Sequence, residues 1–153
     1  MRTRRQVTRI SLAAVAVAAM ATMTGCSMME RQSNMVAFTT QLRAGNEVPP
    51  NASQGNGSVD AVLNKETNLL RWKANFAGLT GPATAAHFHG PAAIGANAGV
   101  AIPWTGPIRS PMEGRATLTP AQAADLLAGR WYANVHTAAH PGGEIRGQMT
   151  PRY

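Results

Sequence analysis

After the first 34 residues, apolar and polar positions alternate with a period of two through most of the chain. Residues 36–42 alternate in this way, which is the pattern of a strand with one buried face. The same alternation recurs over 57–63 and 69–77, on either side of a short polar turn at 64–67. The last two segments predict a hairpin-like connection, and the first predicts a separate strand before it.

Shorter segments of strand character follow, separated by glycine and proline turns. They cover residues 84–89, 99–104, 113–118, 130–137 and 144–149. One helical pattern interrupts them, with Thr119 as N-cap, Pro120 at the first helical position and Gly129 after the last turn. About seven to nine short strands and one crossover helix predict an all-β fold, an antiparallel Greek-key β-sandwich or barrel.

The first 25 residues show a different pattern, that of an export signal. Residues 1–9 hold four arginines and no acidic residue, and residues 10–21 are almost wholly small and apolar. Because this apolar run is too short to cross a bilayer stably, residues 1–25 predict a secretory signal peptide. The pair Arg4 and Arg5 leaves both the general and the twin-arginine export routes open.

Cys26 is the only cysteine and directly follows Met-Thr-Gly at 23–25. This sequence resembles a bacterial lipobox, whose cysteine receives a diacylglycerol and becomes the mature N-terminus. A plain signal peptide with an unrelated cysteine is the alternative. The lipobox predicts a lipidated N-terminus and tether over 26–34 and one domain over 35–153. It also predicts a location in the cell envelope, on the periplasmic side, in the outer membrane or at the cell surface, with the membrane as partner.

The charge of the chain belongs largely to the signal. The formal net charge is +7, and removing residues 1–25 takes away four basic residues and no acidic one, which leaves +3. No basic run remains in the rest of the chain. The composition therefore argues against a nucleic-acid partner, and no protein partner is indicated.

The candidate chemistry lies in two short segments that hold all four histidines. His87 and His89 are two residues apart on a predicted strand, so their side chains share one face, while Phe88 points to the other face and into the core. His136 is predicted on the outer face of its own strand. His140 follows four residues later, at a turn that ends in Pro-Gly-Gly at 141–143.

If the two strands are neighbours, His87, His89, His136 and His140 gather at one place. Imidazole suits copper, zinc, nickel and iron, and the order of divalent affinities favours copper for a site of nitrogen ligands, with zinc second. The alternative is structural: the rings hydrogen-bond loop carbonyls, and Asn134 or Thr137 satisfies His136. Spacing along the chain leaves both interpretations open.

Other motifs of catalysis are missing from the sequence. It contains no nucleophile elbow, no P-loop and no dinucleotide fingerprint, so no catalytic residue is assigned. Glu144 and Arg146 are expected on a solvated strand face. The loop at 46–50 is interpreted either as a functional loop or, more simply, as a structural turn.

Three motifs resemble the CHRD domain, which is named after chordin and occurs in bacterial secreted proteins. They are LRAGNEVPP at 42–50, AHFHGP at 86–91, and WYANVHT at 131–137 with PGGEIRGQ at 141–148. The resemblance spans residues 35 to 149 and implies an all-β sandwich of immunoglobulin-like or superoxide-dismutase-like type. The growth-factor role of chordin does not carry over to a bacterial lipoprotein.

A weaker resemblance is to copper-zinc superoxide dismutase. His87 and His89 match its His-x-His pair of copper ligands, and His136 stands for a further ligand, but a second cluster for zinc is missing. The expected function is therefore transition-metal binding by a lipid-anchored protein. A dismutase-like copper redox enzyme and a metal-free structural or adhesion module are the alternatives.

Overall fold

The computed structural model describes residues 34–152 of the chain. The predicted signal peptide, Cys26 and nearly all of the predicted tether lie outside these residues, and the expectations for them stay predictions. Within the described residues, no helix has the length and apolar character needed to cross a membrane.

The described residues form strands with one α-helix and one short 3-10 helix. The strands are β1 (Met35–Arg43), β2 (Asn56–Asn64), β3 (Leu69–Ala77), β4 (Ala83–His89), β5 (Val100–Pro103), β6 (Met112–Thr117), β7 (Tyr132–Thr137), β8 (Ile145–Gln148) and β9 (Thr150–Arg152). The helices are η1 (Ala44–Asn46) and α2 (Pro120–Leu127). The predicted all-β class with a single crossover helix is confirmed.

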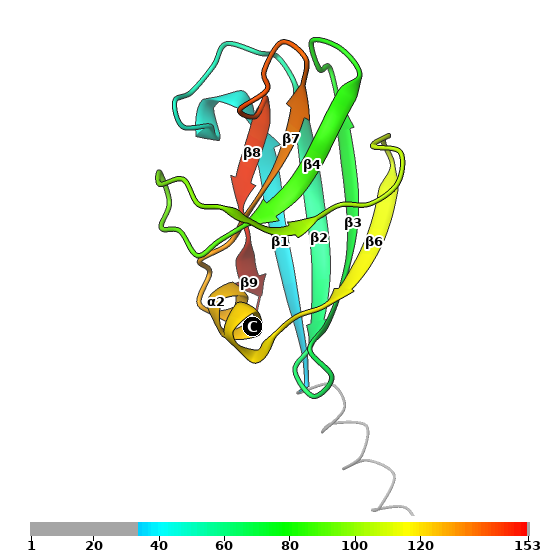
Figure 1. Cartoon of the computed structure of the whole chain (residues 1–153), viewed down its shortest axis with the longest axis vertical. Helices are drawn as coiled ribbons and strands as arrows, with labels where there is room; N and C mark the ends of the chain where they lie inside the picture. The colour runs from blue at the N-terminus through cyan, green and yellow to red at the C-terminus, as the bar shows by residue number, and fades with distance from the viewer. Residues whose placement is uncertain (1–33, 153) are drawn as a thin grey trace, which may run out of the picture. The chain divides into compact units, whose positions relative to one another are not determined.

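All strands belong to one antiparallel sheet with the order β5-β4-β7-β8-β1-β2-β3-β6, and β9 pairs with β1. The sheet bends at the short β1–β8 contact, where Arg43 faces Arg146. This bend brings the half made of β5, β4, β7 and β8 over the half made of β1, β2, β3 and β6 (Figure 1). The result is the barrel-like Greek-key arrangement that the strand pattern predicts.

The core fills the space between the two halves. Phe88 of β4 is fully buried, and its ring lies edge-on to that of Trp72 of β3, with centroids 5.1 Å apart. Trp104 and Trp131 also pack against Phe88. Burying large aromatic side chains contributes strongly to stability, so Phe88 fixes which face of β4 points inward and which points outward.

Helix α2 begins and ends where the sequence predicts. The Thr119 side chain accepts from the Gln122 backbone N–H while the Gln122 side chain accepts from that of Thr119, a capping box, and proline opens the helix. Gly129 follows with a φ of 70°, the left-handed region that glycine tolerates. Ala123 and Leu126 are buried against the core, so the helix closes the end of the sheet near β9 (Figure 1).

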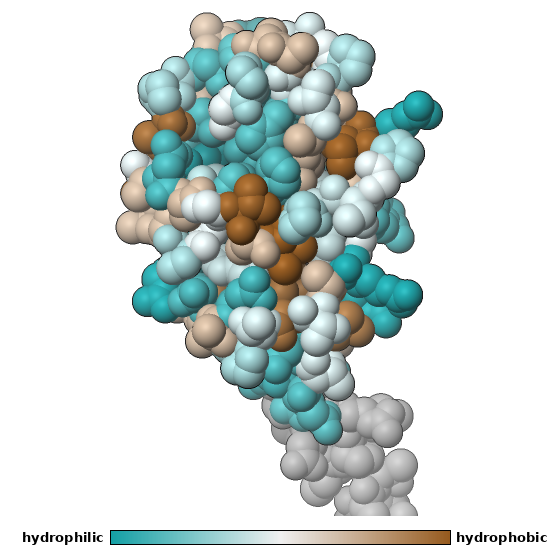
Figure 2. All heavy atoms as spheres, viewed as in Figure 1, coloured by the Kyte–Doolittle hydropathy of each residue, from teal (hydrophilic) through white to brown (hydrophobic). Residues whose placement is uncertain are grey.

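Strand β9 was not expected from the sequence, because it contains Pro151. This proline lies opposite Phe38 of β1. Since β9 pairs only with β1 among the described strands, it is an edge strand, where a missing N–H is tolerated. The outer surface is mainly polar, and on the face seen in Figure 2 hydrophobic residues form only small clusters among hydrophilic ones.

Candidate metal centre

The pairing of β4 with β7 assembles the candidate site. In the register of these strands His87 lies opposite Asn134, His89 opposite Tyr132, and Ala85 opposite His136. Side chains that face each other across an antiparallel pair share one side of the sheet. Since Phe88 points into the core, the three histidines and Asn134 all lie on the outer side.

The imidazole rings of His87, His89 and His136 converge. Nδ1 of His87 lies 3.1 Å from Nε2 of His136, and the ring centroids of His87 and His89 are 5.4 Å apart. One ring nitrogen from each of the three lies within 4.8 Å of the others. Among the described residues, this is the group whose side chains are close enough to share one metal ion.

Main-chain carbonyls determine the tautomers of His89 and His136, and so which nitrogen of each ring keeps a lone pair directed into the cluster. Nδ1 of His89 lies 3.0 Å from the carbonyl of Ala98, and Nδ1 of His136 lies 2.9 Å from that of Pro141. Because a carbonyl only accepts, each Nδ1 carries the hydrogen, and Nε2 of the neutral ring keeps its lone pair. Metal-binding histidines show this arrangement, in which the second N–H is held by a carbonyl.

Asn134 completes the inner part of the cluster. Its side chain is buried, with 2% of its surface exposed, and its Oδ1 lies 3.0 Å from Nε2 of both His89 and His136. The amide oxygen and the two Nε2 atoms are all acceptors when the rings are neutral. A proton on one of these rings would join them by hydrogen bonds, and a metal cation bound between them would be attracted by all three.

The environment of the site keeps His87 and His136 neutral. Burial, together with repulsion between a charged His87 and the nearby His136 and His89, lowers the pKa of His87 to about 4. Burial also lowers the pKa of His136, against the opposing effect of its hydrogen bond to Pro141. Neutral imidazole is the form that binds metals, so these residues present lone pairs at neutral pH.

His140 is the one predicted ligand that lies outside this group. Its backbone N–H donates to the carbonyl of Thr137, and its carbonyl accepts from Gly143. These contacts shape the β7–β8 turn, which carries the Pro141 carbonyl that holds His136. The turn predicted between the two residues is present, but it does not bring the two rings together.

The expectation that Glu144 and Arg146 lie on a solvated face is wrong. Glu144 has 0% of its surface exposed and Arg146 has 2%. The tertiary structure buries both residues. Strand β8 lies between β7 and β1 in the bent sheet, and loops from distant parts of the sequence cover the outer face of β8.

Arg146 holds one of these loops against the histidine site. Its guanidinium donates to the carbonyl of Ala96 at 2.6 Å and to Oδ1 of Asn97 at 2.8 Å. It also lies 3.4 Å above the ring centroid of Tyr132, whose other neighbour is the His89 ring, stacked at 4.8 Å with a 3° interplanar angle. Arg146 therefore fixes the Tyr132 ring that stacks on His89. It also fixes the loop whose Ala98 carbonyl accepts a hydrogen bond from His89.

Glu144 connects three segments of the chain by hydrogen bonds at the end of β7. It accepts hydrogen bonds from the side chains of Ser53, Thr80 and Thr137 and from the Thr80 backbone N–H. Burial alone would raise the pKa of Glu144, but these hydrogen bonds outweigh it and lower the pKa to about 2. The carboxylate thus anchors the start of the turn that follows His136.

Glu47 is a further buried carboxylate that sequence analysis did not select. It lies in the 46–50 loop with 6% of its surface exposed. Burial raises its pKa to about 7, while the charge of Arg146 and hydrogen bonds from the Val48 backbone and the Asn134 side chain partly oppose this rise. A lone glutamate before Val-Pro-Pro carries no sequence signal of burial, so only the fold reveals it.

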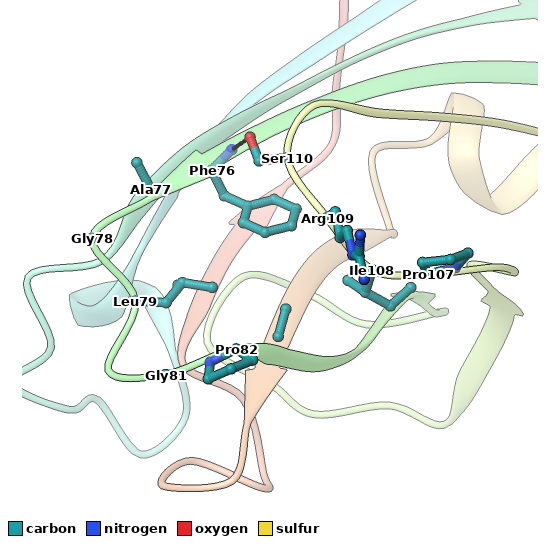
Figure 3. A pocket seen from close by; sticks show the side chains of 11 residues that line it. Phe76, Ala77, Gly78, Leu79, Gly81, Pro82, Pro107, Ile108, Arg109 and Ser110 are labelled. Atoms are coloured by element: carbon teal, nitrogen blue, oxygen red, sulfur yellow. Dashed lines mark hydrogen bonds between the residues drawn. The ribbon is translucent and has the colours of Figure 1, made fainter.

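The hollow shown in Figure 3 is a separate feature. It measures about 580 Å³ and lies between the β3–β4 connection and the segment that precedes β6. Apolar side chains such as Phe76, Leu79 and Ile108 line it, with Arg109 at its side, and it contains none of the four histidines. It therefore adds no ligand to the metal centre.

Comparison with known proteins agrees with this architecture. The family model for the CHRD domain matches residues 38–149, which include all the strands and loops that build the site. Searches of curated proteins and of solved structures each found no significant match. The chain belongs to the CHRD domain family.

Proposed function

We propose that this protein binds a transition-metal ion through His87, His89 and His136, with copper preferred and zinc second. The observation that carries the proposal is the convergence of three ring nitrogens within 4.8 Å of one another. In two of these rings the opposite nitrogen is held by a carbonyl. Such a hydrogen bond from the far nitrogen fixes the tautomer and the orientation of a metal-binding imidazole.

The donor set supports the choice of metal. Three imidazoles are nitrogen ligands of borderline softness, which suit copper(II) and zinc, whereas magnesium and calcium prefer sites made of oxygen ligands. The neighbouring amide oxygen of Asn134 is a hard donor, and one such oxygen does not make a magnesium or calcium site. Copper(II) is bound more tightly than zinc by most sites of this composition. The described residues offer no cysteine, so an all-sulfur site is excluded there.

Metal analysis of the wild-type protein tests this proposal. The protein is purified without a histidine tag, and bound copper and zinc are measured by mass spectrometry. Affinities follow from competition with chelators of known strength. One metal ion per chain is expected, and the double variant H87A/H89A is expected to bind none. Wild-type protein with no bound metal and no affinity for copper or zinc would overturn the proposal.

We also propose that a lipid on Cys26 holds the domain at the cell envelope. The lipobox-like Met-Thr-Gly-Cys sequence at 23–26, after a basic and then apolar leader, supports this location. The variant C26S is expected to move the protein from the membrane fraction to the soluble fraction of its host. Unchanged membrane association of C26S would contradict lipidation.

A further inference from the structure

Asn134 occupies the centre of the candidate site, although its side chain is not a histidine. It lies directly opposite His87 in the β4–β7 register. Its Oδ1 is equally close, at 3.0 Å, to the two Nε2 atoms whose rings are held by carbonyls. An ion bound between those nitrogens would therefore have this oxygen beside it.

An asparagine amide has two ends of nearly equal size and opposite hydrogen-bonding character. Only the oxygen end can bind a cation, so something must decide which end faces the imidazoles. In this protein the NH2 end faces Glu47. Nδ2 of Asn134 and Oε1 of Glu47 lie around one point above Gly143. The Asn134 side chain lowers the pKa of Glu47 as a hydrogen-bond donor, and the ionised form of this carboxyl group accepts only.

Gly143 makes the approach of these two side chains possible. A Cβ atom at Gly143 would lie 2.8 Å from Nδ2 of Asn134 and would overlap Oε1 of Glu47. Both atoms therefore face the same point, above a residue without a side chain. Oε1 of Glu47 is buried and has no hydrogen-bond partner among the described residues, and Nδ2 of Asn134 is the donor that lies around the same point above Gly143.

We propose that Oδ1 of Asn134 is the fourth ligand of the metal ion and that Glu47 is a positioning residue that keeps this oxygen directed at the site. This inference rests on the metal binding proposed above. It assigns three imidazole nitrogens and one amide oxygen to the ion. Glu47 acts only through Asn134, since the carboxylate itself holds the far end of the amide.

A rescue experiment tests the proposal. In E47A the amide of Asn134 loses its acceptor and can turn its NH2 end toward the imidazoles, so copper affinity is expected to fall by about tenfold or more. In the double variant E47A/N134D, the new carboxylate offers oxygen at both ends and needs no orientation. Its copper affinity is expected to return to that of the wild type or exceed it.

The matched control is E66A, which removes one negative charge from an exposed turn and is expected to leave copper affinity unchanged. Affinity is measured by chelator competition with copper(II), and electron paramagnetic resonance of each copper-loaded variant reports its ligands. The spectrum of E47A is expected to differ from that of the wild type, since an oxygen ligand is lost.

Two results would overturn the positioning role. One is an E47A variant with the affinity and spectrum of the wild type. The other is a loss in E47A that N134D does not restore, because a merely structural defect is not repaired by a new oxygen. Both differ from failure of the metal site itself, in which the wild-type protein already binds no copper.

A measurement on the wild type covers the case in which a variant does not fold. On addition of zinc(II), the side-chain NH2 resonances of Asn134 are expected to shift in nuclear magnetic resonance spectra and to exchange slowly with solvent. The cause is that the ion polarises the amide toward Glu47. Unchanged resonances in the zinc-loaded protein would overturn the assignment of Asn134 as a ligand.

Discussion

Nδ1 of His87 lies 3.1 Å from Nε2 of His136, although 49 residues separate them in the chain. The chain passes through β5, β6 and helix α2 between β4 and β7, and β7 then pairs antiparallel with β4. Two short motifs are thereby joined into one cluster. The pairing of β4 with β7 thus sets the geometry of the candidate metal centre.

His136 is expected to contribute more to metal binding than any other single histidine. It is close to His87, to Asn134 and, through its Nδ1, to Pro141. H136A should therefore weaken copper binding at least about a hundredfold, by loss of a ligand. H140A should bind like the wild type, since His140 lies outside the cluster. Chelator competition measures both, and equal losses would place His140 in the site.

Phe88 is expected to couple the stability of the core to the shape of the site. Its side chain is fully buried among three tryptophans. F88A should lower the free energy of unfolding by about 3–5 kcal/mol, and F88L by considerably less. Urea unfolding of the metal-free protein measures both. A loss below about 1 kcal/mol in F88A would contradict the role of Phe88 as the anchor of β4.

Glu144 should make the protein less stable in acid. Its folded pKa of about 2 lies below the ordinary value of 4.5, so the unfolded chain takes up this proton more readily than the folded one. The stabilisation is complete above about pH 4.5 and is lost as the pH falls toward 2. E144Q should cost about 3 kcal/mol at pH 7.

The measurement for Glu144 is urea unfolding between pH 3 and pH 7. The free energy of unfolding of E144Q should depend less on pH than that of the wild type in this range. E66Q, which changes an exposed carboxylate, is the control and should follow the wild type. A parallel pH dependence in E144Q and the wild type would refute the argument.

Glu47 should affect the pH dependence of stability in the opposite direction to Glu144. Its pKa is raised from 4.5 to about 7, so the folded metal-free protein holds this proton more tightly than the unfolded chain. The free energy of unfolding should fall between about pH 4.5 and pH 7, by up to about 1.4 kcal/mol for each pH unit. E47Q, which resembles the protonated form, should abolish this fall. The same pH dependence of the free energy of unfolding in the wild type and E47Q over this range would contradict the argument.

The alternation of residues along the chain was sufficient to predict every strand except β9, the inward position of Phe88 and the outward position of its two histidine neighbours. Thr119, Pro120 and Gly129 likewise marked both ends of helix α2. These features depend on local geometry, since a strand repeats every two residues and a helix is capped by its nearest neighbours. Three CHRD motifs also identified the family before any fold was known.

Only the tertiary structure decided which outward-facing side chains meet. It united His87 and His89 with His136 and left His140 at the turn. It also buried Glu47, Glu144 and Arg146, which local pattern could not reveal because loops distant in the sequence cover them. The position of Asn134 between the histidines and Glu47 also depends on distant parts of the chain, through strand register and loop packing. The alternation of residues with a period of two predicts only which face of its own strand a side chain occupies.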